Sequence, residues 1–313
     1  MNANDVGRIA CPLALLMALG GLGRPTSAVQ FSDWSLPQNL GVVVNSPANE
    51  QHPALSPDGL SLYFSSDRPG GAGGFDLWVT RRDTQSASWQ NPVAVGSLNS
   101  SSSEFAPAFD PTGRWLFFGS ERDGGCGARD VWLSYRSNRQ DAFGWKPPIA
   151  LGCGLSWSGF DDGPTYFRED TTGVGVLFFI SDRPGGAGGR DIWMASHRNG
   201  GAFGAPVNVI ELNSAADDSR PAVSADGLQF FFTSQRIGSV VSGSAPSSDL
   251  WTATRSSTAH AWSPPVNLAA LNTAATEAAP TLSADGTTLL FNSNRPGGQG
   301  GLDLYIATRS RVN

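Results

Sequence analysis

Five short, strongly apolar runs recur along the chain, and each predicts a β-strand that is buried on both faces. The runs are Leu60–Phe64, Trp115–Phe118, Val176–Ile180, Phe230–Phe232 and Leu289–Phe291. A turn precedes each run, as at Ser-Pro-Asp-Gly 56–59, where proline presets φ and glycine accepts the positive φ that ends such turns. A further short strand stands before each turn, so every unit begins with a predicted hairpin.

A glycine-rich loop follows each apolar run. It reads Ser-Asp-Arg-Pro-Gly-Gly-Ala-Gly-Gly at 66–74 and again at 181–189, with one close copy at 293–301 and looser copies after Ser120 and Ser234. A third strand then begins at an aspartate followed by an apolar residue and an aromatic one. An aromatic residue with a proline three positions later announces a fourth strand, and these aromatics are Trp89, Trp145, Phe203 and Trp262.

The aspartates that open the third strands set the period of the repeat. They are Asp76, Asp130, Asp191, Asp249 and Asp303, spaced by 54 to 61 residues. A four-stranded unit at this spacing is typical of a propeller blade, which must stack on its neighbours to bury its two apolar faces. The sequence therefore predicts an all-β fold, a five-bladed β-propeller of four-stranded antiparallel blades.

The two ends of the repeat indicate how the ring closes. Trp34, Pro37 and the segment 39–41 look like a fourth strand with no first three before it, and the chain stops after a third strand at 303–309. We expect the N-terminal strand to complete the last blade, one strand plus three, which removes the exposed edges.

The repeated elements Pro-Ala-Leu-Ser-Pro-Asp-Gly (53–59), Leu-Tyr-Phe-Ser-Ser-Asp-Arg (62–68) and Asp-Leu-Trp (76–78) resemble the WD40-like β-propeller repeat of the TolB type. The resemblance covers nearly all of the chain after residue 28. It implies a periplasmic or secreted propeller and no particular reaction. TolB itself has six blades and an extra N-terminal domain, for which this chain has no room.

Composition and the N-terminus indicate an exported protein. Arg8, an apolar stretch over 9–22 and the small residues at 26–28 are typical of a signal peptide, so we expect residues 1–28 to be removed and 29–313 to form a single domain. The apolar stretch is too short to span a bilayer. The net charge of -6 argues against a nucleic-acid partner. We expect a monomer that is periplasmic or secreted, without a membrane span.

An acidic residue stands three positions before a proline where each first strand begins. These residues, called the first-strand carboxylates below, are Glu50, Glu104, Asp161, Asp218 and Glu277. Because first strands line the central channel, the carboxylates could ring its mouth. One interpretation has each carboxylate accepting hydrogen bonds from backbone N–H groups, and recurrence in every blade favours it. The other has them converge on a cation such as calcium, a sugar or a basic peptide. No other cofactor is expected.

The glycine-rich loops carry an arginine and an aspartate in every blade. The arginines are Arg68, Arg122, Arg183, Arg236 and Arg295, and the aspartates are those that open the third strands. We expect an Arg–carboxylate bridge to staple each loop. A phosphate cradle is disfavoured because no Lys-Ser/Thr follows the glycines and a strand, not a helix, comes next.

Departures from the repeat mark candidate binding residues. His52 and Arg220 stand just before the first-strand proline, where the other blades have Ala106, Gly163 and Ala279. The third blade adds Trp157, Phe160 and the pair Asp161-Asp162, and the fourth blade has an enlarged loop over 237–248. These features could form a one-sided pocket with an aromatic wall suited to a sugar or a peptide. The chain's three histidines suggest no metal triad or Ser–His–Asp order, so no catalytic residue is singled out.

Cys126 and Cys153 are expected to form a disulfide. They are the cysteines left after removal of the signal, each lies between two glycines, and loop alternation places both on one face of the second blade. An exported chain reaches a compartment where such a bond persists.

Two classes of function are compatible with these patterns. The regular repeat without an evident catalytic set favours a non-catalytic binding or scaffold module for an envelope protein or a glycan. The alternative is a carbohydrate-active enzyme, because other five-bladed propellers are glycosidases that place carboxylates at the channel mouth. Two carboxylates beside an open cleft with an aromatic platform would favour the enzyme. Fold analogy alone does not decide between them.

Overall fold

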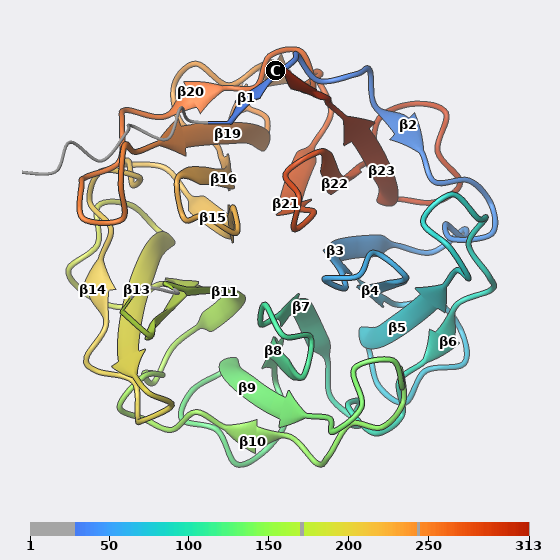
Figure 1. Cartoon of the computed structure of the whole chain (residues 1–313), viewed down its shortest axis with the longest axis horizontal. Coiled ribbons are helices and arrows are strands. Elements are labelled where there is room, and N and C mark those ends of the chain that lie inside the picture. The colour runs from blue at the N-terminus through green and yellow to red at the C-terminus, as the bar shows by residue number, and fades with distance from the viewer. Residues whose placement is uncertain (1–28, 170–171, 243–244, 313) are drawn as a thin grey trace, which may run out of the picture.

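The computed structural model describes residues 29–169, 172–242 and 245–312, and these form five small antiparallel sheets around a central channel (Figure 1). Each sheet has four strands, so the predicted five-bladed β-propeller is confirmed. The proposed signal peptide lies outside the described residues. Within the described ranges no helix is long and apolar enough to cross a membrane.

The first three blades each contain four strands consecutive in sequence, ordered from the channel outward. Blade 1 comprises β3 (Glu50–Leu55), β4 (Ser61–Ser66), β5 (Asp76–Arg81) and β6 (Val93–Ala94). Blade 2 comprises β7 (Glu104–Phe109), β8 (Trp115–Ser120), β9 (Asp130–Tyr135) and β10 (Ile149–Ala150). Blade 3 comprises β11 (Asp161–Arg168), β12 (Val174–Ser181), β13 (Asp191–Arg198) and β14 (Val207–Asn208). The first three strands of blade 3 have eight residues, whereas those of the other blades have six.

The last two blades include the structural irregularities of the ring. Blade 4 comprises β15 (Asp218–Val223), β16 (Gln229–Ser234), β19 (Asp249–Thr254) and β20 (Val266–Asn267). Its enlarged loop forms a separate two-stranded hairpin of β17 (Val241–Ser242) and β18 (Ala245–Pro246). Blade 5 comprises β21 (Glu277–Leu282), β22 (Thr288–Ser293), β23 (Asp303–Thr308) and, on the outside, β2 (Gln38–Asn39).

The N-terminal segment closes the ring as the sequence predicts. In β2, Gln38 pairs with Ile306 and Asn39 with Tyr305 of β23. A second pairing was not expected from the sequence: β1 (Gln30–Phe31) runs antiparallel to β24 (Arg311–Val312). Both ends of the described chain are therefore tied to the same side of the ring (Figure 1).

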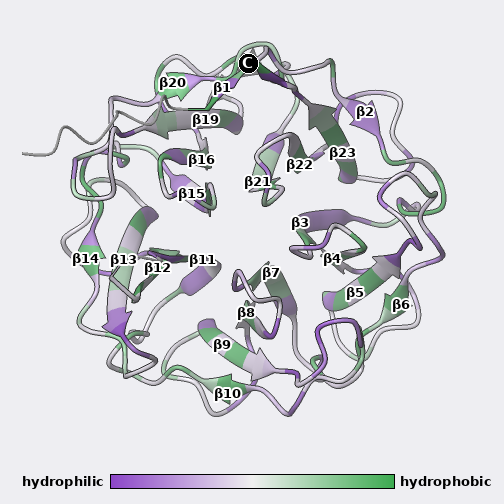
Figure 2. Cartoon of the chain, viewed as in Figure 1, coloured by the Kyte–Doolittle hydropathy of each residue, from purple (hydrophilic) through white to green (hydrophobic). Residues whose placement is uncertain are grey.

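The apolar runs form the core, which is divided among the interfaces between neighbouring blades. We call each interface a seam and number it by its two blades. The middle residues of the second strands are almost fully buried, as for Phe64, Phe118 and Phe232 at 0% exposure. The innermost strands β3, β11 and β15, which lie next to the channel, contain hydrophilic stretches (Figure 2). Four short strands thus bury both faces only by stacking, as expected for a propeller.

The glycine-rich loops are explained by two close approaches. A Cβ on Gly71 would lie 1.9 Å from Oδ2 of Asp76, and a Cβ on Gly73 would lie 1.8 Å from the carbonyl oxygen of Ser102 in the next blade. A side chain at either position would therefore collide with the loop's own aspartate or with the neighbouring blade. The loops after Asp182 and Asn294 repeat both approaches, which accounts for the near-identity of the three loops.

The predicted disulfide between Cys126 and Cys153 is confirmed, with a Cα–Cα distance of 5.5 Å. It joins the glycine-rich loop of blade 2 to the connection that leads into blade 3.

We expect the double variant Cys126→Ser, Cys153→Ser to lose stability, because the bond closes a loop with a sequence separation of 27 residues. The chain-entropy model gives about 3 kcal/mol for a loop of this size. Urea unfolding of oxidised protein, reduced protein and the variant measures the loss. The reduced protein serves as the control and should match the variant. Equal midpoints for all three samples would contradict the prediction.

Candidate functional site at the channel mouth

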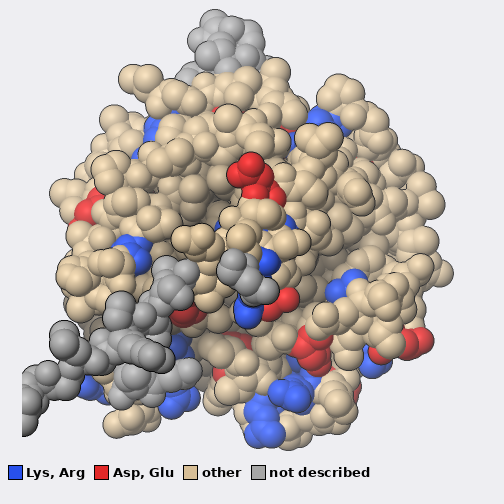
Figure 3. Space-filling view, turned by 45° about the horizontal axis from the view of Figure 1, so that its top comes forward, with Lys and Arg blue, Asp and Glu red and all other residues tan. Residues whose placement is uncertain are grey.

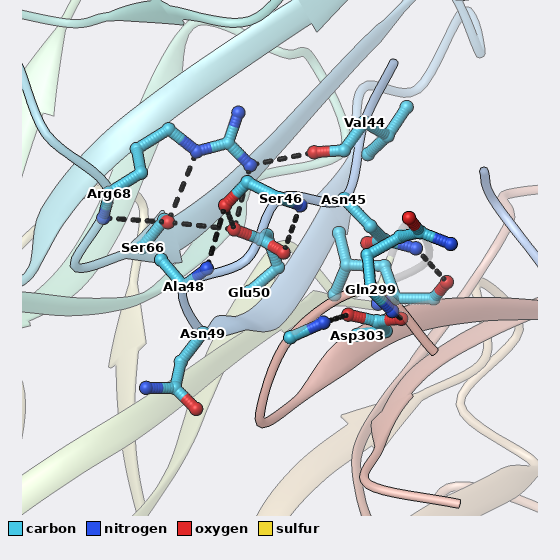
Figure 4. A network of polar contacts seen from close by, with 12 residues as sticks. Val44, Asn45, Ser46, Ala48, Asn49, Glu50, Ser66, Arg68, Gln299 and Asp303 are labelled. Carbon is cyan, nitrogen blue, oxygen red and sulfur yellow. Dashed lines mark hydrogen bonds and ion pairs between the residues drawn. The ribbon is translucent and has the colours of Figure 1, made fainter. Parts of the chain in front are cut away.

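The first-strand carboxylates lie inside the protein instead of facing the channel. Glu50 accepts hydrogen bonds from the backbone N–H and the hydroxyl of Ser46 and from the hydroxyl of Ser66, and it pairs with Arg68 at 2.9 Å (Figure 4). The same guanidinium donates to the carbonyl oxygen of Val44 (Figure 4). One carboxylate therefore holds together the connection into its blade, the second strand and the glycine-rich loop.

All five blades repeat this arrangement. The ion pairs, between 2.5 and 3.0 Å, are Arg68–Glu50, Arg122–Glu104, Arg183–Asp161, Arg236–Asp218 and Arg295–Glu277. Every carboxylate in the set is 0% exposed. Because each carboxylate is already bound by an arginine, by hydroxyl groups or by backbone N–H groups, the set offers no open ring for a cation, a sugar or a peptide. The geometry agrees with the interpretation in which each carboxylate orders the chain around its own strand, and not with the interpretation in which the carboxylates form a binding ring.

The loop aspartates have a different role from the one expected. Asp76 accepts hydrogen bonds from the backbone N–H groups of Ala72 and Gly73, and Asp130 accepts them from Cys126 and Gly127. Asp191, Asp249 and Asp303 likewise bond to backbone N–H groups of their own loops. The staple thus has two separate parts. The aspartate orders the loop backbone, and the arginine reaches the first-strand carboxylate.

Three of the departures from the repeat, His52, Asp162 and Arg220, lie together at the channel mouth. Asp162 is wholly buried, and its Oδ2 accepts hydrogen bonds from Arg129 at 2.8 Å and from Arg220 at 2.6 Å. Its other oxygen, Oδ1, has no partner among the described residues. Oδ1 instead lies against the backbone at Gly119, where a Cβ would be 2.0 Å away. Three blades thus contribute to one ionic cluster.

Burial and the two arginines shift the pKa values of Asp162 and His52 in this cluster. Burial alone would raise the pKa of Asp162, but Arg220 and Arg129 outweigh it and hold the pKa well below its ordinary value. Burial, reinforced by Arg220, lowers the pKa of His52 far below its ordinary value. At neutral pH the cluster therefore contains one ionised carboxylate, two guanidinium groups and a neutral imidazole.

The channel itself is narrow. Its cavity of about 40 Å³ is lined by His52 and Arg220 together with residues such as Ala106 and Ala279. These four residues have positive φ at the bulge of each first strand, as does Gly163 in blade 3. Such a cavity holds no more than a few water molecules. A larger ligand therefore does not fit in the channel and would bind outside it.

Aromatic side chains lie beside the ionic cluster. The guanidinium of Arg129 lies 3.7 Å from the ring centre of Phe105 and 4.7 Å from that of Phe160. Arg190 lies 4.4 Å from Phe160 on the blade 3 side. Trp157 is linked to Phe160 through Asp182, because its Nε1 donates at 2.8 Å to the carboxylate oxygen that also accepts from the backbone N–H of Phe160.

Two exposed carboxylates flank these aromatic side chains. Glu121 follows the second strand of blade 2 and accepts from Arg129 at 2.6 Å. Asp182 follows the second strand of blade 3, and its Oδ1 accepts from Trp157 and from the backbone N–H of Phe160 at 2.9 Å. Charged side chains of both signs are scattered among uncharged ones on the face shown in Figure 3, with no extended patch of one sign.

Sequence reasoning did not identify Arg129, Glu121 or Asp182. Arg129 precedes a third-strand aspartate, where the other blades have Phe75, Arg190, Ser248 and Leu302. Aligning the five repeats at that position would have shown the variation. The contact of Arg129 with Asp162 depends on the packing of two blades, which the repeat pattern does not contain. Among the described residues, no group of three or more His, Cys, Asp or Glu side chains could hold a metal ion.

Comparison with known proteins places the fold beside several enzymes. No protein family matches the sequence, and no curated protein is significantly similar to it. An α-L-arabinofuranosidase from Podospora anserina matches at a TM-score of 0.56 and 13% identity, covering 89% of this chain and 97% of that one. An endo-arabinase from Bacteroides thetaiotaomicron matches at 0.56 and 12% identity, covering 91% and 98%. A putative TolB from Agrobacterium tumefaciens reaches only 0.46 at 14% identity, too low to extend the TolB resemblance beyond the shared propeller fold.

These matches contradict the expectation of a non-catalytic binding or scaffold module. The solved structures that share most of this chain's fold include arabinofuranosidases, arabinanases and a family-43 glycoside hydrolase. The leading expectation of a non-catalytic module, with enzymatic activity uncertain and the less favoured outcome, is therefore corrected, because these matches agree better with the alternative of a carbohydrate-active enzyme. At 11 to 14% identity the likeness establishes the fold alone.

Proposed function

We propose that the protein is a carbohydrate-active enzyme that hydrolyses glycosidic bonds on the face around the channel mouth. The observation that carries the proposal is the exposed pair Glu121 and Asp182, which flanks the aromatic wall of Phe160 and Trp157. Glycosidases generally use two carboxyl groups on either side of the scissile bond. The partly exposed indole of Trp157 beside them provides a surface on which a sugar ring can lie. The fold of the matched glycosidases supports this reading as an analogy.

In this proposal the buried cluster positions the site without touching the substrate. Asp162 fixes one end of the Arg129 guanidinium, whose other end holds Glu121. Arg129 also covers Phe105 and contacts Phe160, so its orientation determines the shape of the wall. The ionised state of Asp162 keeps this arrangement in place at neutral pH. Arabinose-containing glycans are the first substrates to test, because the matched enzymes are described as acting on them.

Hydrolysis of linear arabinan and of 4-nitrophenyl α-L-arabinofuranoside by the purified protein tests the proposal. We expect Glu121→Gln and Asp182→Asn each to lower kcat about 10²–10⁴-fold, the range for loss of a general acid or base. Asp67→Asn is the matched control, because Asp67 holds the equivalent position in blade 1 and accepts the same kind of hydrogen bonds, from Asn49. Its activity should stay unchanged. Equal losses in all three variants, or no hydrolysis by the unaltered protein, would contradict the proposal.

We also propose that the protein works in the periplasm or outside the cell. The disulfide supports this location, because such bonds persist in oxidising compartments. Reactivity of Cys126 and Cys153 toward a thiol reagent, measured in protein recovered from intact cells without reductant, is the direct check.

A further inference from the structure

Four of the five seams are filled near their outer edge by the same pair of side chains, a tryptophan under an arginine. The guanidinium lies 4.2 to 4.4 Å from the indole in the pairs Arg82–Trp89, Arg136–Trp145, Arg255–Trp262 and Arg309–Trp34. In each pair the arginine Nε donates to the carbonyl oxygen of the turn glycine of its own blade at 2.7 to 2.9 Å. The seam is therefore shaped to hold a flat aromatic ring at this point.

The seam between blades 2 and 3 lacks this pair. His197 stands where the other blades have the arginine, six residues after the third-strand aspartate, and Phe203 stands where they have the tryptophan. Phe203 packs edge-on against His197 with ring centres 4.8 Å apart. Phenylalanine and histidine fill less space than tryptophan and arginine. A cavity of about 480 Å³ opens there, bordered by Trp115, Phe117, Leu133 and Tyr166 as well as the two replacements.

Tyr166 presents a hydrogen-bond donor to this cavity. The backbone N–H of Gly200 donates to Nδ1 of His197 at 3.2 Å, so Nδ1 carries no proton. Burial, with a contribution from Arg168, lowers the pKa of His197, and the neutral ring must carry its proton on Nε2. Nε2 then donates to the Tyr166 oxygen at 2.8 Å, which leaves the tyrosine's own proton without an acceptor among the described residues.

The backbone leaves room for this pair. A Cβ on Gly175 of β12 would lie 2.1 Å from the Tyr166 oxygen and 2.3 Å from Nε2 of His197. Any other residue at position 175 would displace them. The extra length of β12 and β13 thus contributes Gly175 and His197, whereas Tyr166 is the sixth residue of β11, within the length common to all first strands.

One cation, Arg168, and one carboxylate, Asp110, border the cavity, and only the carboxylate is held by hydrogen bonds from its own turn. Arg168 is exposed at the end of β11, borders the cavity, and makes no ion pair with the part of the chain that the structure describes. Asp110 also borders the cavity, but its carboxylate accepts from the Thr112 hydroxyl and from the backbone N–H groups of Arg114 and Trp115. The cavity therefore offers aromatic walls, a donor and a cation. A neutral sugar would leave many of its hydroxyl groups unpaired against such walls.

We propose that the seam between blades 2 and 3 binds a small aromatic carboxylic acid. Its ring lies beside Phe203, in the space that the larger tryptophan and arginine side chains fill in the other four seams. Its carboxylate accepts the Tyr166 proton and pairs with Arg168. This site lies between blades 2 and 3 and shares no residue with the carboxylate pair proposed for hydrolysis, so it does not depend on that proposal.

Isothermal titration calorimetry with cinnamate, and with cinnamyl alcohol as its uncharged counterpart, tests the assignment. We expect cinnamate to bind and the alcohol to bind at least about tenfold more weakly, since the alcohol lacks the charge that strengthens the hydrogen bond from Tyr166 and pairs with Arg168. Tyr166→Phe and Arg168→Gln should each weaken cinnamate binding about tenfold or more. Tyr135→Phe, a tyrosine change on the neighbouring strand β9 outside the cavity, should leave it unchanged.

The variant Phe203→Trp gives the decisive comparison, because it restores the residue that the other blades use. We expect it to fold, with an unchanged or raised Tm, and to lose cinnamate binding. Cinnamate binding with unaltered affinity in Phe203→Trp, or no cinnamate binding by the unaltered protein, would overturn the proposal. Binding of an arabino-oligosaccharide that is lost in Phe203→Trp, without any binding of cinnamate, would assign the cavity to a sugar and would also overturn it.

Discussion

Neutralising three of the first-strand carboxylates together, by Glu50→Gln, Asp161→Asn and Glu277→Gln, is expected to unfold the protein. Each carboxylate is 0% exposed and holds a guanidinium that is itself only 10 to 14% exposed. Removing one partner of a buried pair leaves the other charge uncompensated and costs about 3–5 kcal/mol. Three such losses are of the order of the whole net stability of a typical domain, about 5–15 kcal/mol.

Circular dichroism and thermal melting of the triple variant measure the effect, and each single variant should lie between it and the unaltered protein. The control changes the same number of charges at three exposed aspartates, Asp33, Asp83 and Asp123. It should melt normally. A triple variant that melts like the control would show that these carboxylates are not structural and would reopen their role as a binding ring.

Deleting residues 31–42 is expected to produce the second large effect. The deletion removes β2 from the outside of blade 5 and Phe31 and Trp34 from the face of Arg309, where their ring centres lie 3.7 and 4.3 Å from the guanidinium. Trp34 also packs edge-on against Phe231 of blade 4. We expect a loss on the order of 5 kcal/mol, or about 10 °C in Tm, because core aromatic truncations alone cost about 3–5 kcal/mol. The exposed edge of β23 should also promote aggregation.

Differential scanning calorimetry and size-exclusion chromatography report the two consequences. Leu36→Ser is the control within the same segment, because this side chain is 81% exposed and should hardly affect Tm. A monomeric deletion variant with an unchanged Tm would mean that β2 does not close the ring.

The repeat made the fold predictable from the sequence. The candidate site was less predictable, because it is formed by residues that are present in one blade and differ at the equivalent positions of the others. Arg68 and Asp76 recur in every blade, so their structural importance was evident. Their partners were not evident, because Glu50 and Asp76 both recur in every blade and either could have paired with Arg68. Asp162 was recognised as a departure from the repeat, but its contacts with Arg129 and Arg220 join three blades and follow from packing alone. The replacement of an arginine by His197 was visible in the repeat. The cavity that results is recognised only by comparison with the other four seams, where an arginine and a tryptophan fill the same space.

The pairing of β1 with β24 has a mechanical consequence. Tension applied between the two described ends of the chain would act first on this short antiparallel pair and then on β2 against β23. Both pairings belong to the edge of blade 5, so blades 1 to 4 would carry little of the load until that blade had been peeled apart. Under tension the ring would therefore open at blade 5, in two steps, with β1 separating from β24 before β2 separates from β23.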